Sequence, residues 1–137
     1  MNIRFVASFA PIARDVAATR ALYRDALGIT FEGDAGDYVY THQLDGVKHL
    51  GLWPLDQAAV ACFGVSEWPA DVMIPQASIE FEVSDAGAVA GAAAELEEKG
   101  FELLHGAREE PWGQTVARLQ SVDALIIGIS YAPWLHR

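Results

Sequence analysis

The stretch that decides the fold is FVASFAPIARDVAATRALYRDALG at residues 5–28, because a second stretch, PQASIEFEVSDAGAVAGAAAELEEKG at residues 75–100, follows the same plan. Each begins with a short apolar strand, passes through an aspartate into one helix and closes with a glycine. Asp15 and Asp85 hold the same place in the two copies. A repeat of this length indicates two similar units that must pack together to bury one core. We therefore predict two modules with a cleft between them.

Both helices have residues suited to their ends. The two aspartates can begin the helices, since a carboxylate there accepts backbone N–H groups two or three residues on. Gly28 and Gly100 can end them, because the residue that closes a helix often takes a left-handed conformation. In the first helix, four apolar residues recur at roughly helical spacing and are predicted to face the core: Val16, Leu22, Tyr23 and Leu27.

Short strand-like segments follow each helix and complete the modules. The Asp45-Gly46 pair is a two-residue hairpin signal, and residues 56–62 are predicted to form a short helix. The strands expected after the two helices are residues 29–32, 37–44, 47–53, 101–104, 115–120 and 124–131. The order is βαβββ twice. We predict one domain, made of a first module at residues 1–63, a connection at 64–76 and a second module at 77–137.

Two fold classes fit this alternation of strands and helices. A doubly wound nucleotide-binding fold would need a glycine-rich phosphate loop after a first strand, and neither copy has one. Each module has one convincing helix followed by hairpins. The pattern therefore predicts an α+β protein with sheets rich in antiparallel pairs, each backed by a helix.

Composition and net charge limit the classes of partner that the chain could bind. The chain of 137 residues has 9 Lys and Arg against 19 Asp and Glu, a net charge of −10. The negative electrostatic field of such a chain repels phosphate backbones, which argues against nucleic acid as a partner. The same charge favours a cationic ligand, or it simply keeps the protein in solution. Cys62 is the one cysteine, so no internal disulfide forms. No apolar run is long enough to cross a bilayer, and we expect a cytoplasmic protein without a membrane partner.

Three stretches resemble the vicinal oxygen chelate superfamily of glyoxalases, bleomycin-resistance proteins and ring-cleaving dioxygenases. They are residues 14–28, 83–104 and 109–131, which together span nearly the whole chain. The family usually has an Asp-Pro-Asp-Gly turn in its closing hairpin, where this chain has SVDA at residues 121–124. The resemblance implies paired βαβββ modules that form an incomplete barrel around a ligand cleft, usually in a homodimer.

The resemblance also indicates where a metal would bind. Most enzymes of the superfamily hold one divalent metal through histidine, glutamate or glutamine from the first and last strands of each module. The matching positions here are Ser8, Gly51, Ser78 and Gly128. Glycine offers no side chain, and a neutral serine hydroxyl is a poor metal ligand. We therefore expect no metal at the family positions and no cofactor.

A displaced metal site is the alternative. If the register is wrong by two residues, His42, His49 and Glu80 could supply ligands, because two residues along a strand move a side chain by about 7 Å. The protein would then be a metal-dependent lyase, isomerase or dioxygenase of the same superfamily. An accessory domain that acts through protein contacts is a third possibility.

No catalytic residue stands out in the sequence. Cys62 has no neighbouring basic residue to activate it, and the serines have no recognisable base partner. Our leading hypothesis is a metal-free, small-molecule-binding protein of the bleomycin-resistance type, which confers antibiotic resistance by sequestering its ligand and needs no turnover. The sequence leaves enzymatic activity open and favours binding without turnover.

The predicted cleft is aromatic and acidic. Glu80 and Glu82 alternate with Ile79 and Phe81, which places the two carboxylates on the face away from the helix. Aromatic faces beside carboxylates suit a planar or cationic molecule. The predicted ligand-binding residues are Ser8, Tyr40, His42, His49, Trp53, Trp68, Ser78, Glu80, Glu82 and Trp112.

Overall fold

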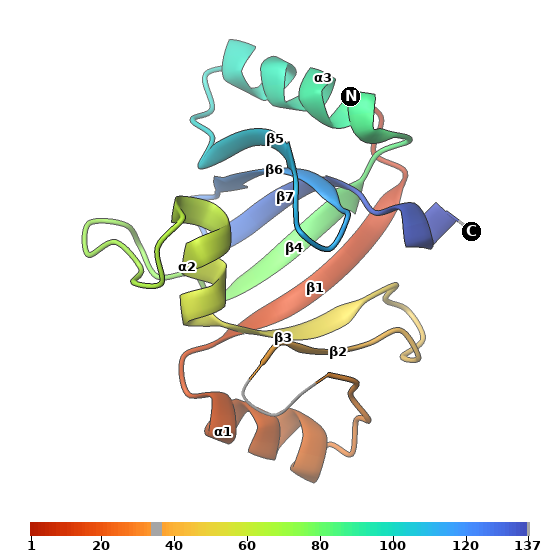
Figure 1. Ribbon diagram of the computed structural model, residues 1–137, viewed down its shortest axis with the longest axis vertical. Coiled ribbons are helices and arrows are strands. Elements are labelled where there is room, and N and C mark those ends of the chain that lie inside the picture. Colours follow the sequence, from red (N-terminus) through yellow and green to blue (C-terminus); the bar gives the residue numbers. More distant parts are fainter. Residues whose placement is uncertain (34–36, 137) are drawn as a thin grey trace.

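The computed structural model describes residues 1–33 and 37–136 and contains one mixed sheet with helices at its ends and side (Figure 1). The strands are β1 (Phe5–Ala13), β2 (Val39–Thr41), β3 (Leu50–Pro54), β4 (Ala77–Glu82), β5 (His105–Glu109), β6 (Thr115–Gln120) and β7 (Leu125–Tyr131). The helices are α1 (Val16–Arg20), which continues as the π-helix η1 (Ala21–Ala26), α2 (Leu55–Phe63), α3 (Ala86–Glu98) and the 3₁₀-helix η2 (Pro133–His136).

The sheet is built around the first strands of the two repeats. Its order is β2-β3-β1-β4-β7-β6-β5, and β1 pairs with β4 in antiparallel fashion at the centre. On either side, β1 lies parallel to β3 and β4 lies parallel to β7. The two halves therefore share this pairing pattern, although among the described residues the first has three strands and the second four, and Figure 1 shows α1 and α3 at opposite ends of the sheet. The predicted α+β class with an incomplete barrel is confirmed.

The predicted helix ends are also confirmed. Asp15 accepts from the Ala18 backbone N–H at 3.0 Å, and Asp85 accepts from that of Ala88 at 2.8 Å. Gly100 follows α3 with a φ of +92°, a conformation that glycine adopts without steric cost. The residue types at these positions therefore set the helix bounds locally.

The predicted buried face of the first helix is wrong in part. Leu22 and Leu27 are 51% and 59% exposed, although Val16 and Tyr23 are half-buried. The reason is the change to π-helix after α1, in which the Leu27 N–H bonds to the Leu22 carbonyl, five residues back. Residues spaced for an α-helix do not stay on one face of this wider turn.

Four strand predictions need correction. Residues 29–32 form only an isolated bridge between Glu32 and Tyr40, and the strands expected at 37–44 and 47–53 are shortened to β2 and β3. Residues 101–104 are not a strand, because the Phe101 N–H still bonds to the Leu96 carbonyl and completes the end of α3. The strand β5 therefore begins only at His105.

Candidate functional site

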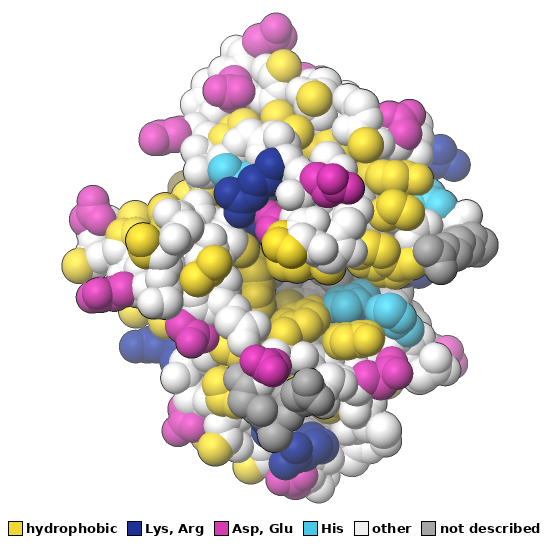
Figure 2. All heavy atoms as spheres, viewed as in Figure 1, with side chains coloured by type: hydrophobic (Ala, Val, Ile, Leu, Met, Phe, Trp, Pro, Cys, Tyr) yellow, Lys and Arg dark blue, Asp and Glu magenta, His cyan; other side chains and the backbone are white. Residues whose placement is uncertain are grey.

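A cavity of about 790 Å³ opens between the sheet, α2, the turn before β6 and the C-terminal helix η2. Figure 2 shows this face of the molecule hollowed, with hydrophobic side chains gathered along the hollow. Most residues that line it are aromatic or apolar, and a few polar groups converge between them. This composition is typical of a small-molecule site.

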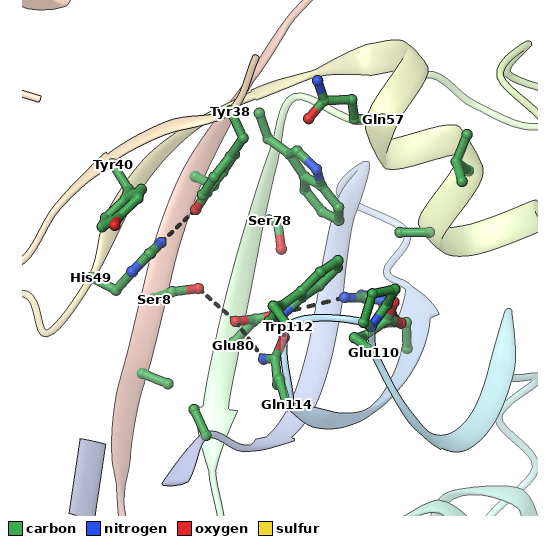
Figure 3. Close-up of a pocket in the computed structure, with 18 of the residues that line it drawn as sticks. Ser8, Tyr38, Tyr40, His49, Gln57, Ser78, Glu80, Glu110, Trp112 and Gln114 are labelled. Atoms are coloured by element: carbon green, nitrogen blue, oxygen red, sulfur yellow. Dashed lines mark hydrogen bonds and ion pairs between the residues drawn. The ribbon is translucent and has the colours of Figure 1, made fainter. Parts of the chain in front are cut away.

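The polar part of the cavity centres on Glu80 of β4. Its Oε1 atom accepts from the Ser8 hydroxyl at 2.8 Å and from the Gln114 side-chain amide at 3.1 Å (Figure 3). The same amide donates to the Ser130 hydroxyl at 2.8 Å, and the Trp112 ring N–H donates to the Gln114 Oε1 atom at 2.8 Å. Glu80 is therefore held in one position by groups from β1 and the turn before β6.

Arg118 of β6 supplies a buried positive charge beside the carboxylates. It is 1% exposed; its Nη2 atom lies 4.0 Å from Glu80 Oε2 and its Nη1 atom 2.9 Å from Glu110 Oε1. The guanidinium also lies over the Trp53 ring, 5.5 Å from its centre. Burial alone would raise the pKa of Glu110, but the charge of Arg118 and the hydrogen bonds from Arg108 and Arg118 outweigh it and lower that pKa. Glu110 is therefore a stable carboxylate.

Tyr38, Tyr40 and His49 form an aromatic wall on the other side of the cavity. The His49 ring stacks on Tyr38 and Tyr40 with centroid distances of 5.8 and 5.3 Å. The Tyr38 hydroxyl hydrogen-bonds to His49 Nε2, and His49 Nδ1 lies 2.7 Å from His42 Nε2. Burial, with a smaller effect of His42, lowers the pKa of His49 to about 4, so the ring is neutral at neutral pH.

Neighbouring side chains cover the two glycines at the family metal positions. A Cβ atom at Gly51 would overlap the phenol of Tyr38, and one at Gly128 would lie 3.0 Å from Glu80 Cγ. Ser8, the matching residue of β1, is used to hold Glu80. Within residues 1–33 and 37–136, no group of three or more histidine, cysteine, aspartate or glutamate residues gathers in a way that could hold a metal ion.

Eight of the ten predicted ligand-binding residues line the cavity. They are Ser8, Tyr40, His42, His49, Trp53, Ser78, Glu80 and Trp112. Two of them, His42 and His49, contact each other, with 2.7 Å between His42 Nε2 and His49 Nδ1. Proximity to the cavity does not show binding, so their role stays a prediction.

The structure places Trp68 and Glu82 elsewhere, which corrects the prediction for both. Trp68 packs edge-on against Phe63 and donates its ring N–H to the Val72 carbonyl at 3.0 Å, so it belongs to the core under α2. Glu82 is fully buried beneath η2, where its Oε2 atom accepts from the Ala132 backbone N–H and from His136. The C-terminal segment therefore removes this carboxylate from the cavity.

Several residues that line the cavity were missed by sequence reasoning. They are Glu110, Gln114, Arg118 and Trp134. Arg118 could have been noticed as a charged residue between apolar neighbours, Ala117 and Leu119, since charged residues are rarely buried without partners. Trp134 reaches the cavity through η2, and nothing local to the sequence shows that this C-terminal helix returns to the cavity.

Comparisons with known proteins agree on the fold. No protein-family model and no curated protein sequence matches the chain. Among solved structures, a glyoxalase/bleomycin resistance protein/dioxygenase superfamily member from Vibrio splendidus has a TM-score of 0.56 and 17% identity, covering 94% of this chain and 98% of its own. A methylmalonyl-CoA epimerase from Streptomyces coelicolor, in complex with 2-nitronate-propionyl-CoA, has a TM-score of 0.56 and 16% identity, covering 96% of both chains.

A further structure, described as an NAD-dependent benzaldehyde dehydrogenase from Legionella pneumophila, has a TM-score of 0.58 and 13% identity, covering 90% of this chain and 96% of its own. At such identities the likeness concerns the fold alone. The chain therefore has the fold of the glyoxalase/bleomycin resistance/dioxygenase superfamily, as the resemblance implied. No helix among the described residues has the length and apolar character needed to cross a membrane.

Proposed function

We propose that the cavity binds a small organic molecule with a planar aromatic part and a cationic or hydrogen-bond-donating group, and that retention of this ligand is a sequestering, resistance-type function. The observation that carries the proposal is the pairing of the aromatic wall with the fixed carboxylate of Glu80 in one cavity of about 790 Å³. Flat rings stack well on aromatic side chains, and a carboxylate held by other donors attracts a cation without reorganising.

The Oε2 atom of Glu80 is the expected anchor for the ligand. Its Oε1 atom already accepts from Ser8 and Gln114, whereas the nearest cation to Oε2 is the Arg118 guanidinium at 4.0 Å, beyond hydrogen-bond distance. A donor group of a ligand therefore has an acceptor on the cavity side.

Two ligands of the same shape test this proposal. N-methylquinolinium is a flat cation, and methylnaphthalene is its uncharged isostere. We expect both to quench tryptophan fluorescence through Trp53 and Trp112. Glu80→Gln should lower the affinity for the cation about tenfold. It should change the affinity for the neutral ligand by no more than about twofold, since only the charge interaction is lost.

The matched control is Glu109→Gln, which removes the same charge from an exposed position on β5. It should leave both affinities unchanged. Equal weakening of both ligands by Glu80→Gln would contradict the electrostatic part of the proposal, and no quenching by either ligand would contradict the binding function.

The predicted assembly and location belong to the same proposal. A homodimer is supported by apolar side chains that are exposed outside the cavity, among them Val6, Phe9, Leu22 and Leu27. A cytoplasmic location is supported by the lone, buried Cys62, whose thiol pKa burial raises to about 11.

A further inference from the structure

The cavity contains a chain of hydrogen bonds that ligand binding alone does not require. The Tyr38 hydroxyl bonds to one ring nitrogen of His49, and the other ring nitrogen of His49 lies 2.7 Å from His42 Nε2. All three side chains line the cavity, and His42 is also exposed on the surface. Figure 3 shows the Tyr38 hydroxyl pointing to His49 on the side of the cavity that faces Ser8 and Glu80. The chain therefore connects the inside of the cavity to solvent.

The hairpin of β2 and β3 positions this chain. Thr41 of β2 pairs with Leu50 of β3, so His42 and His49 are the next opposed residues beyond the paired strands. Tyr38 must then lean along the sheet to reach His49, and it does so across Gly51, where any Cβ atom would overlap the phenol. The glycine is thus a steric condition for the contact.

We propose that the Tyr38–His49–His42 chain transfers a proton between a ligand in the cavity and solvent, which gives the site an acid–base activity on ligands with a weakly acidic hydroxyl or ammonium group. This inference rests on the proposed function, because the cavity must first hold the ligand. It goes beyond that function, because retention of a ligand needs no proton path.

The proton steps balance along the chain. The ligand O–H bond breaks as its proton moves to the Tyr38 oxygen, and the Tyr38 hydroxyl proton moves to His49 Nε2. The His49 Nδ1 proton moves to His42 Nε2, which leaves an imidazolium at the surface and an anion in the cavity. The imidazolium then releases its Nδ1 proton to water, and the reverse sequence protonates a ligand.

The surroundings keep the inner two groups neutral between transfers. Burial, and to a smaller extent the charge of Glu80, raises the pKa of Tyr38, and burial lowers that of His49 to about 4. Neither group therefore holds a lasting charge, so a proton passes through them in concert. Glu80 is the competing acceptor, although Ser8 and Gln114 already donate to it.

Naphthol is a direct probe, because it is planar and becomes a strong acid when excited by light. Its neutral and anionic forms emit at different wavelengths, so the emission reports whether the bound molecule has lost its proton. The fluorescence polarisation of the naphthol reports binding separately. We expect bound naphthol to emit mainly as the anion in the native protein.

Two variants interrupt the Tyr38–His49–His42 hydrogen bonds without removing Glu80. Tyr38→Phe removes only the hydroxyl, and Gly51→Ala breaks the Tyr38–His49 contact while keeping every titratable group. Each should lower the ratio of anionic to neutral emission by at least about tenfold, since a positioned proton-transfer group typically contributes about 10²-fold or more. Glu109→Gln, at an exposed position on β5, is the control and should retain the anionic emission.

His42 supplies the decisive readout, because its site is exposed and His42→Ala leaves the buried part of the chain intact. This variant should also lose anionic emission, and imidazole added to the solution should restore it in proportion to its concentration. A merely structural role of His42 would not be rescued in this way.

Three outcomes would overturn the inference. Bound naphthol that emits only as the neutral form in the native protein would leave the binding function standing and refute the proton path. Loss of anionic emission in Glu80→Gln but not in Tyr38→Phe would assign the proton to Glu80. The absence of any change in polarisation would contradict both proposals.

Discussion

At the scale of single residues, the cavity depends on where side chains are absent as much as on where they are present. Gly51 makes room for the Tyr38 phenol, and Gly128 makes room for the Glu80 side chain. At both positions a side chain from the neighbouring segment therefore occupies the space that a Cβ atom would need.

The buried His49 ring predicts a pH dependence of stability. Its pKa is about 4 in the folded chain, against an ordinary value of 6.5, so the unfolded chain binds a proton first as the pH falls. The stability that depends on a neutral His49 is complete above about pH 6.5 and is lost as the pH falls towards 4. Between about pH 7 and pH 5 the free energy of unfolding should drop by roughly 2 kcal/mol from this group.

Urea unfolding of the native protein and of His49→Gln at both pH values measures this effect. The variant should lose less stability on acidification than the native protein, because glutamine does not titrate. His105→Gln is the companion variant, since burial also lowers the pKa of His105 at a separate site. Equal losses in the native protein and His49→Gln would show that the ring is not held neutral.

At the scale of secondary structure, the helices are specified mainly by their ends. The carboxylate of Asp85 satisfies a backbone N–H that would otherwise have no partner at the start of α3. Apolar residues of α3 then pack against Val83, Ala117 and Ile129. The cap sets where the helix begins, and the packing supplies most of its stability.

Asp85→Ala is therefore expected to lower the free energy of unfolding by about 1 kcal/mol. Asp85→Asn is the matched control, because asparagine is an equally good first residue and should change the stability by only a few tenths of a kcal/mol. Thermal unfolding followed by circular dichroism compares the two. A loss of equal size in both variants would mean that the charge, not the cap, matters.

The first helix shows the limit of reasoning from spacing. Leu22 and Leu27 follow an α-helical pattern, yet the π-helix η1 turns both outward. A backbone hydrogen bond that reaches five residues back, as from Leu27 to Leu22, widens the turn and changes which face of the helix a residue occupies. Exposed leucines on such a segment are a reason to look for a partner surface.

At the scale of the whole molecule, the exposed apolar residues predict self-association. Phe9 of β1 and Leu27 after η1 are both exposed in the single chain. We expect the native protein to sediment as a dimer, and Phe9→Lys and Leu27→Lys to shift it to the monomer, since a buried lysine without a partner is costly. The control is Val122→Lys in the turn before β7, because the Val122 side chain is 94% exposed. This variant should stay dimeric. A monomeric native protein in analytical ultracentrifugation would refute the homodimer.

The sequence by itself determined the repeat, the helix caps at Asp15 and Asp85 and the fold class, because these depend on local residue types and on a pattern that occurs twice. Only the tertiary structure decided the site. Glu82 shares one face of β4 with Glu80 in the sequence pattern, yet the chain around Ala132, 50 residues later, buries it. Arg118 enters the cavity because β6 folds beside β7. Contacts between residues far apart in the sequence leave no local signal, so the site's charges and its proton path appear only once the chain is folded.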